Sequence, residues 1–143
     1  MGNISKNFSF DEFEYSARAI AEGIENKIPS AQVVAAIKNL TVTVLQPLRD
    51  DLEASVIVES GYRCKELNEL VGGVESSQHR KGEASDIRSP FFEPLYIARR
   101  IVALQLPFDQ LILYPTFVHV SHKLKGKQRG QILYNRRWTG EKI

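Results

Sequence analysis

The 143-residue sequence is poor in cysteine, in long apolar runs and in net charge, and each shortage excludes a class of protein. Cys64 is the only cysteine, so the chain cannot form an internal disulfide bond. No apolar run approaches the ~20 residues of a transmembrane helix, and residues 1–8 lack the apolar segment of a signal peptide. The formal net charge is +2, without a stripe of basic residues interleaved with aromatics, which argues against a nucleic-acid partner.

The remaining composition is typical of one globular domain, which we expect to cover residues 1–143. Apolar residues make up 43% of the chain and charged residues 25%, both ordinary values for such a domain. The C-terminal region 123–137 is basic. We interpret it as a solvated hairpin, and the alternative is a weak attraction to anionic polymers such as the phosphate groups of cell walls.

Helical signals dominate the first third of the sequence. Ser9 and Glu12 form a capping box, which predicts a helix over residues 10–21. A second helix is predicted to start at Ser30, and Pro47 should kink or interrupt it near its end. Its apolar face is indicated by residues spaced three or four apart, namely Val33, Ile37, Leu40, Val44 and Leu48.

Short strands are predicted in the later part of the chain. The expected strands cover residues 55–59, 84–88, 110–113, 117–121 and 130–134, and the expected helices between them cover residues 64–71 and 92–104. Helices that come first and strands that cluster later favour an α+β domain, with N-terminal helices packed on a small, mainly antiparallel sheet.

Two of the three histidines lie in contexts that suggest a metal site. His79 is expected at the start of a loop, Gly82 at its turn, and Asp86 on the strand that follows the loop. In the alternating segment 117–121, His119 lies on a polar strand face. His122 falls on the opposite face and is expected at the surface. Two imidazoles and one carboxylate suit catalytic zinc, whereas a single histidine on a strand is more often a packing or surface residue.

Several short motifs extend this pattern over most of the chain. They include Ser-Gly-Tyr-Arg at residues 60–63, Val-Gly-Gly at 71–73, Ser-Gln-His at 77–79 and Val-His-Val-Ser at 118–121. Together they resemble the M15 peptidases, which comprise zinc D-Ala-D-Ala carboxypeptidases and the related L-alanyl-D-glutamate endopeptidases of phage endolysins. The resemblance implies an α+β fold shared with hedgehog-type domains.

Carried over to this sequence, the resemblance implies one Zn²⁺ bound by His79, Asp86 and His119. Arg63 matches an arginine that faces the substrate and holds negative charge on the reacting carbonyl. The alternative for Arg63 is a salt bridge that pins its loop. Ser77 is expected to donate a hydrogen bond near the metal loop, to substrate or to backbone.

One part of the family pattern is missing. Members usually carry an acidic residue shortly before the last histidine, where it takes a proton from the zinc-bound water. The segment 111–119 contains no Asp or Glu, and Tyr114 or Thr116 occupies this region. A tyrosine with a pKa near ~10 is a poor base at neutral pH, although its hydroxyl can donate a hydrogen bond to an oxyanion.

Two other carboxylates come into question as the general base. Asp109 is the nearest one upstream and the better candidate, because alternation puts Glu83 on the face opposite Asp86. Three outcomes follow from the missing acidic residue. Another carboxylate serves, or the metal and Tyr114 suffice, or the domain binds zinc and peptide without turnover.

The function expected from the sequence is zinc-dependent hydrolysis of peptidoglycan stem peptides, with D-Ala-D-Ala carboxypeptidase and endolysin-type endopeptidase both open. The alternative is a zinc-stabilised, inactive module that binds cell wall or virion, and a metal-free structural domain is a remote third. We expect a monomer without stable membrane association. We also expect it to be made in a bacterial cytoplasm and to act on the cell wall, with a phage or prophage lysis protein as the expected setting.

Overall fold

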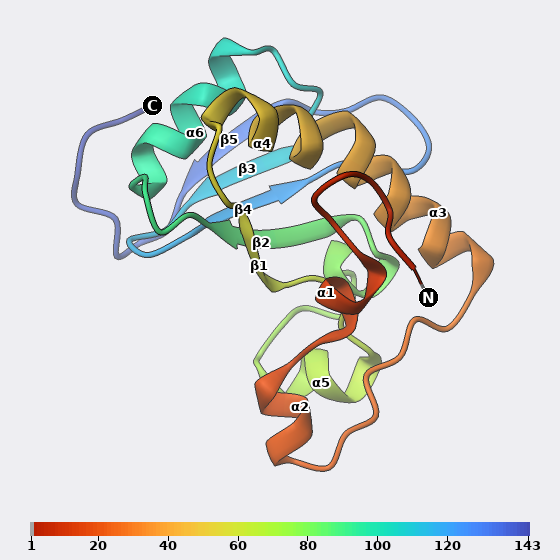
Figure 1. Cartoon of the computed structure of the whole chain (residues 1–143). Helices are drawn as coiled ribbons and strands as arrows, with labels where there is room; N and C mark the ends of the chain where they lie inside the picture. The colour runs from red at the N-terminus through yellow and green to blue at the C-terminus, as the bar shows by residue number, and fades with distance from the viewer. Residues whose placement is uncertain (1) are drawn as a thin grey trace.

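A computed structural model of the chain describes residues 2–143 and has an α+β architecture with one five-stranded sheet (Figure 1). The strands are β1 (Ile57–Ser60), β2 (Ala84–Arg88), β3 (Gln110–Leu113), β4 (Val118–Ser121) and β5 (Gln131–Tyr134). The α-helices are α1 (Phe10–Glu14), α2 (Ala17–Ala21), α3 (Ala31–Leu40), α4 (Gln46–Leu52), α5 (Lys65–Leu70) and α6 (Pro94–Ala103). A π-helical segment, η1 (Thr41–Leu45), joins α3 to α4, and a short 3₁₀ helix, η2 (Gln78–Lys81), precedes β2.

The sheet has the strand order β1-β2-β4-β3-β5. All neighbouring strands are antiparallel except β3 and β5, which run parallel, so the prediction of a mainly antiparallel sheet is confirmed. The interpretation of residues 123–137 as a hairpin is wrong, because β5 does not pair with the preceding strand β4. The chain instead crosses β3 and adds β5 at the edge of the sheet.

The long helical run α3–η1–α4 and helix α6 share one hydrophobic core with the sheet. Helix α6 packs on β3 and β4 and also contacts α4. The expected disturbance at Pro47 takes the form of the π-helical segment directly before it, because proline cannot donate the backbone hydrogen bond that continues a regular helix. The central positions of the predicted apolar face, Ile37, Leu40, Val44 and Leu48, are fully buried.

Two other helix boundaries differ from the prediction. The helix expected over residues 10–21 is broken into α1 and α2, because Tyr15 is extended and the Ser16 hydroxyl accepts a hydrogen bond from the backbone N–H of Ala19. Ser16 is thus a second N-cap inside the predicted helix. Helix α6 begins at Pro94, not at residue 92, in keeping with the preference of proline for the first turn.

The register of the sheet separates an apolar face from a polar face. Ile87, Val118 and Val120 are fully buried in the hydrophobic core, on the same strands as the two predicted ligands. Asp86 lies directly opposite His119 in the β2–β4 pairing, and side chains of directly opposed residues project from the same face. The register therefore joins two residues that are 33 positions apart.

No helix within residues 2–143 is long and apolar enough to cross a membrane.

Candidate metal centre

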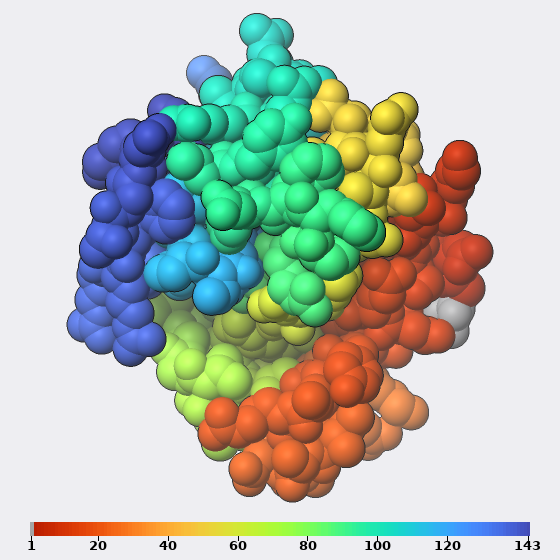
Figure 2. All heavy atoms as spheres, turned by 60° about the vertical axis from the view of Figure 1, so that its left-hand side comes forward, coloured from red at the N-terminus to blue at the C-terminus, as the bar shows by residue number. Residues whose placement is uncertain are grey.

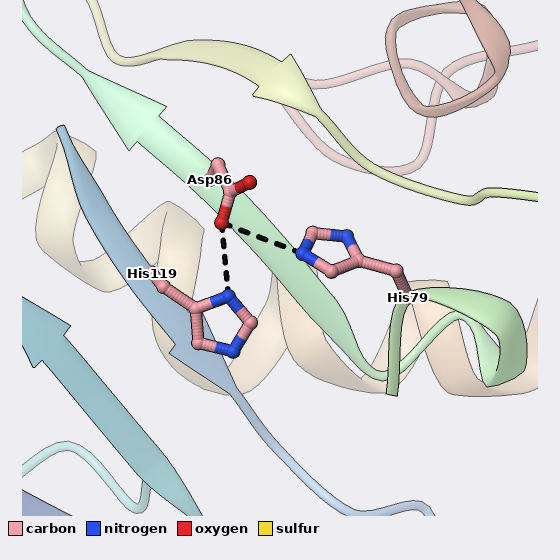
Figure 3. Close-up of side chains that lie close together, drawn as sticks. All are labelled: His79, Asp86 and His119. Atoms are coloured by element: carbon pink, nitrogen blue, oxygen red, sulfur yellow. Dashed lines mark hydrogen bonds and ion pairs between the residues drawn. The ribbon is translucent and has the colours of Figure 1, made fainter. Parts of the chain in front are cut away.

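His79, Asp86 and His119 come together at one point beside the sheet (Figure 3). His79 comes from η2, Asp86 from β2 and His119 from β4. Each residue offers one ligand atom, and these atoms lie within 4.8 Å of one another. The Oδ1 atom of Asp86 is 2.9 Å from His119 Nδ1 and 3.4 Å from His79 Nε2, so one carboxylate oxygen faces both imidazoles. Within residues 2–143 no other group of three or more such residues has this arrangement.

The imidazole of His79 is held by contacts behind it. The Ser77 hydroxyl caps η2 by accepting a hydrogen bond from the His79 backbone N–H, whereas the sequence predicted that this hydroxyl donates. His79 Nδ1 donates to the carbonyl oxygen of Gly61 at 2.7 Å. This bond selects the tautomer in which Nε2 carries a lone pair, and a second partner of this kind is the usual companion of a metal-ligating histidine.

The chemistry of the three donors fits a metal ion. His79 is 3% exposed, and its Nε2 atom has no hydrogen-bond partner among the described residues although it points at the other two side chains. A buried polar atom without a partner costs free energy, and a cation at this point would satisfy it. Two imidazole nitrogens with one carboxylate oxygen form a ligand set used by zinc at catalytic sites.

Electrostatics keep these groups in the protonation states that a cation requires. Burial raises the pKa of Asp86, but the hydrogen bond from His119 and the close contact with His79 outweigh burial and hold that pKa well below its usual value. Burial lowers the pKa of His79 more than the neighbouring Asp86 raises it. At neutral pH the carboxylate is ionised and His79 is neutral, which are the metal-binding forms of both side chains.

Arg63 lies directly against the metal ligands. Its Nη2 atom is 3.2 Å from Oδ2 of Asp86, its Nε atom donates to the Ser60 hydroxyl, and its backbone N–H donates to the carbonyl oxygen of His79. The salt bridge considered from the sequence is therefore present. It leaves Asp86 with Oδ2 on the arginine and Oδ1 turned toward the histidines, so Arg63 orients a ligand as well as carrying positive charge into the site.

The motifs that surround this cluster can be compared with known families. A sequence profile of the Peptidase M15 family matches residues 6–121 of the chain. This chain belongs to the peptidase M15 family. No curated protein sequence matches it significantly. The matched region contains all three side chains of the cluster and Arg63. Membership supports a hydrolase that cleaves peptides and agrees with the α+β fold.

Tyr114 lies close enough to the metal centre for the charges of Asp86 and Arg63 to affect the pKa of its hydroxyl. Its ring stacks on Phe117 across the turn between β3 and β4, with 4.2 Å between ring centroids. Burial raises the pKa of the Tyr114 hydroxyl, the charge of Asp86 raises it further, and Arg63 opposes both. The hydroxyl therefore stays protonated at neutral pH and can donate a hydrogen bond. Thr116, the other residue of this turn considered from the sequence, is exposed.

The two carboxylates considered as general bases are engaged elsewhere. Asp109 is fully buried and accepts hydrogen bonds from the backbone and guanidinium of Arg129 and from Gln78. Glu83 accepts from the backbone N–H of Leu124. Within residues 2–143 neither carboxylate forms a hydrogen bond or ion pair with the metal-centre side chains. The geometry thus disfavours Asp109, and Glu83 as well, as the base.

Two features of the site differ from sequence reasoning or escape it. The expectation that His122 is a surface residue is wrong, because its side chain is buried and Nδ1 donates to the Pro107 carbonyl. The carbonyl of Gly61 carries no side-chain signal, although it orients the most buried ligand. The only sequence clue to it was its place in the motif at residues 60–63. Tyr62, from the same motif, belongs to the core.

Proposed function

We propose that this chain is a zinc-dependent peptidase that hydrolyses the stem peptides of peptidoglycan. The observation that carries the proposal is the convergence of three ligand atoms, one of them the buried and unpartnered Nε2 of His79. Membership of the M15 family supports cleavage of peptides, and the cell wall is where we propose that this activity acts. A zinc ion at this position would supply Lewis acidity, which polarises a carbonyl and acidifies a bound water.

The protein's own groups provide the rest of the chemistry. Asp86 is an ionised acceptor held between two imidazoles and Arg63. Arg63 has five N–H donors, and among the described residues its side chain donates only from Nε and Nη2, so the guanidinium keeps donors for a substrate carbonyl or carboxylate. The protonated hydroxyl of Tyr114 is a second donor for negative charge that develops on the scissile carbonyl.

The test compares two substitutions of buried histidines on purified peptidoglycan. His79→Gln and His122→Gln are matched, because both parent side chains donate from Nδ1 to a backbone carbonyl. We expect one zinc per chain and release of wall peptides for the parent and for His122→Gln, with loss of both for His79→Gln. Mass spectrometry of the products identifies the scissile bond. Unchanged zinc content and turnover in His79→Gln would refute the proposal.

A second function is favoured by the absence of a free carboxylate near the metal centre among the described residues. In this alternative the domain binds zinc and wall peptide without cleaving it. It predicts one zinc per chain and saturable binding of wall fragments, with no new peptide ends after prolonged incubation. The same mass-spectrometric experiment therefore decides between the peptidase and the binding module.

A further inference from the structure

A groove of about 530 Å³ lies between the start of α3, the 3₁₀ helix η2 and the loop that joins β4 to β5. In Figure 1 the blue loop after β4 and the green segment before β2 both approach the orange helix α3 at the right of the view. Figure 2, turned so that the left-hand side of Figure 1 comes forward, shows a different face, on which the blue C-terminal segment borders the green-to-cyan segment that contains α6. None of the three metal-centre side chains lines this groove. It is a second site, separate from the proposed catalytic one.

The side chains that line the groove carry more positive charge than the chain as a whole, whose net charge is +2. Five cationic side chains line it, Arg80, Lys81, Lys123, Lys125 and Arg129, and Glu83 is its one acidic lining residue. They come from two segments, η2 and the β4–β5 loop, that meet only in the folded protein. The excess of positive charge is therefore a property of the fold at this place.

Part of this charge is not engaged in ion pairs. Asp109 lies beneath the groove and pairs with Arg129 and Lys123. Lys81 and Lys125 are exposed and form no ion pair within residues 2–143. The guanidinium of Arg80 donates to a neutral backbone carbonyl. Unpaired cations that converge on a concave surface raise the local concentration of anions.

The N-terminus of α3 adds to the positive potential. Ser30, at the N-cap, lines the groove, and its hydroxyl accepts a hydrogen bond from the backbone N–H of Val33. The first turn of this ten-residue helix contains no acidic residue. The partial positive charge at the helix start thus faces the same groove as the cationic side chains.

We propose that this groove binds a polyol-phosphate chain, a flexible polymer of repeating phosphodiesters. Five cations spread over one groove of about 530 Å³ suit several singly charged phosphates better than one small anion. The groove has no aromatic lining residue, and its apolar contribution comes from Val33 and Leu124. Recognition of single-stranded nucleic acid usually relies on aromatic side chains that stack on bases, so a polymer without bases fits this lining better.

The test measures binding of the whole chain to a synthetic glycerol-phosphate oligomer by calorimetry at several salt concentrations. The double variant Lys81→Gln/Lys125→Gln removes two unpaired charges from the groove, and Lys6→Gln/Lys27→Gln removes two exposed charges elsewhere. We expect the groove variant to weaken binding about 30-fold, with little change for the control. The slope of log affinity against log salt should become shallower by about 1.4, at about 0.7 for each phosphate that the variant no longer neutralises.

Thermal melting shows whether each variant is folded, and exposed Lys→Gln changes should leave the melting temperature within about 2 °C of the parent. Equal weakening in the groove and control variants would mean unspecific attraction by net charge, which overturns the proposal. So would tighter binding of a single-stranded oligonucleotide with the same number of phosphates. Tighter binding to vesicles of anionic phospholipid than to the oligomer would also overturn it.

Discussion

Asp109→Asn removes the charge of a buried carboxylate while keeping its shape, and its effect can be worked out from the contacts. The carboxyl group has no exposed surface, and its Oδ2 lies 2.7 Å from Nη2 of Arg129. Burial raises the pKa of Asp109, but the hydrogen bonds of Arg129 and the charges of Arg129 and Lys123 outweigh burial and lower that pKa from 3.8 to about 2. The ionised carboxylate is therefore more favourable in the folded state than in the unfolded chain.

At about 1.4 kcal/mol for each pH unit, this difference in pKa corresponds to about 2.5 kcal/mol of stability at neutral pH. Arg129 is half exposed, so water screens part of the attraction and the expected loss is between about 1.5 and 2.5 kcal/mol. Because the folded pKa is lowered, this stability is complete above about pH 4 and disappears as the pH falls toward about 2. About half of it should remain at about pH 3.

The assay is urea unfolding of the parent and Asp109→Asn at pH 7 and pH 3. Asparagine mimics the protonated carboxyl group, so the gap in unfolding free energy should be present at pH 7 and roughly halved at pH 3. Other titrating groups cancel in the comparison as long as they are independent of Asp109. Equal stability at pH 7, or a gap that does not shrink on acidification, would refute the assignment of Asp109 as a structural ion-pair partner.

Two further predictions concern the metal centre. A Cβ atom at Gly61 would lie 2.7 Å from Cδ1 and 2.8 Å from Cα of Phe13. Gly61→Ala should therefore lower the free energy of unfolding in urea by about 1–3 kcal/mol, and it should weaken zinc binding by moving the carbonyl that orients His79. The control Gly2→Ala, where a Cβ atom meets open space, should change neither quantity. If Tyr114 donates to the scissile carbonyl, Tyr114→Phe should lower kcat about 10²-fold with little change in KM, and the matched Tyr96→Phe should not. Unchanged kcat in Tyr114→Phe would exclude it from catalysis.

The parts of the fold that sequence reasoning predicted well are those with strong local signals. The spacing of apolar residues from Val33 to Leu48 identified the long helical run, and alternation identified β4. The parts it missed depend on competition or on distant pairing. The helix break at Ser16 arises because a second N-cap competes with continuation of the helix. The parallel position of β5 beside β3 could not be predicted, because strand pairing is decided by contacts between segments about 20 residues apart.

The same distinction applies to the candidate site: the ligand side chains could be predicted from the sequence, and the contacts around them could not. His79, Asp86 and His119 could be grouped in advance because motif and strand alternation both act on side chains, and the β2–β4 register brings the last two opposite each other. The group that orients His79 for a cation is the backbone carbonyl of Gly61. Because every residue has a backbone carbonyl, the residue type does not indicate this role. Asp109 was predicted as a base because the sequence does not show which groups its carboxylate contacts. Its position next to β3 could be read from the sequence, whereas its partner Arg129 is 20 positions away and lies beside it because β5 pairs with β3. A carboxylate in an M15 chain should therefore be judged as a base by its partners in the fold.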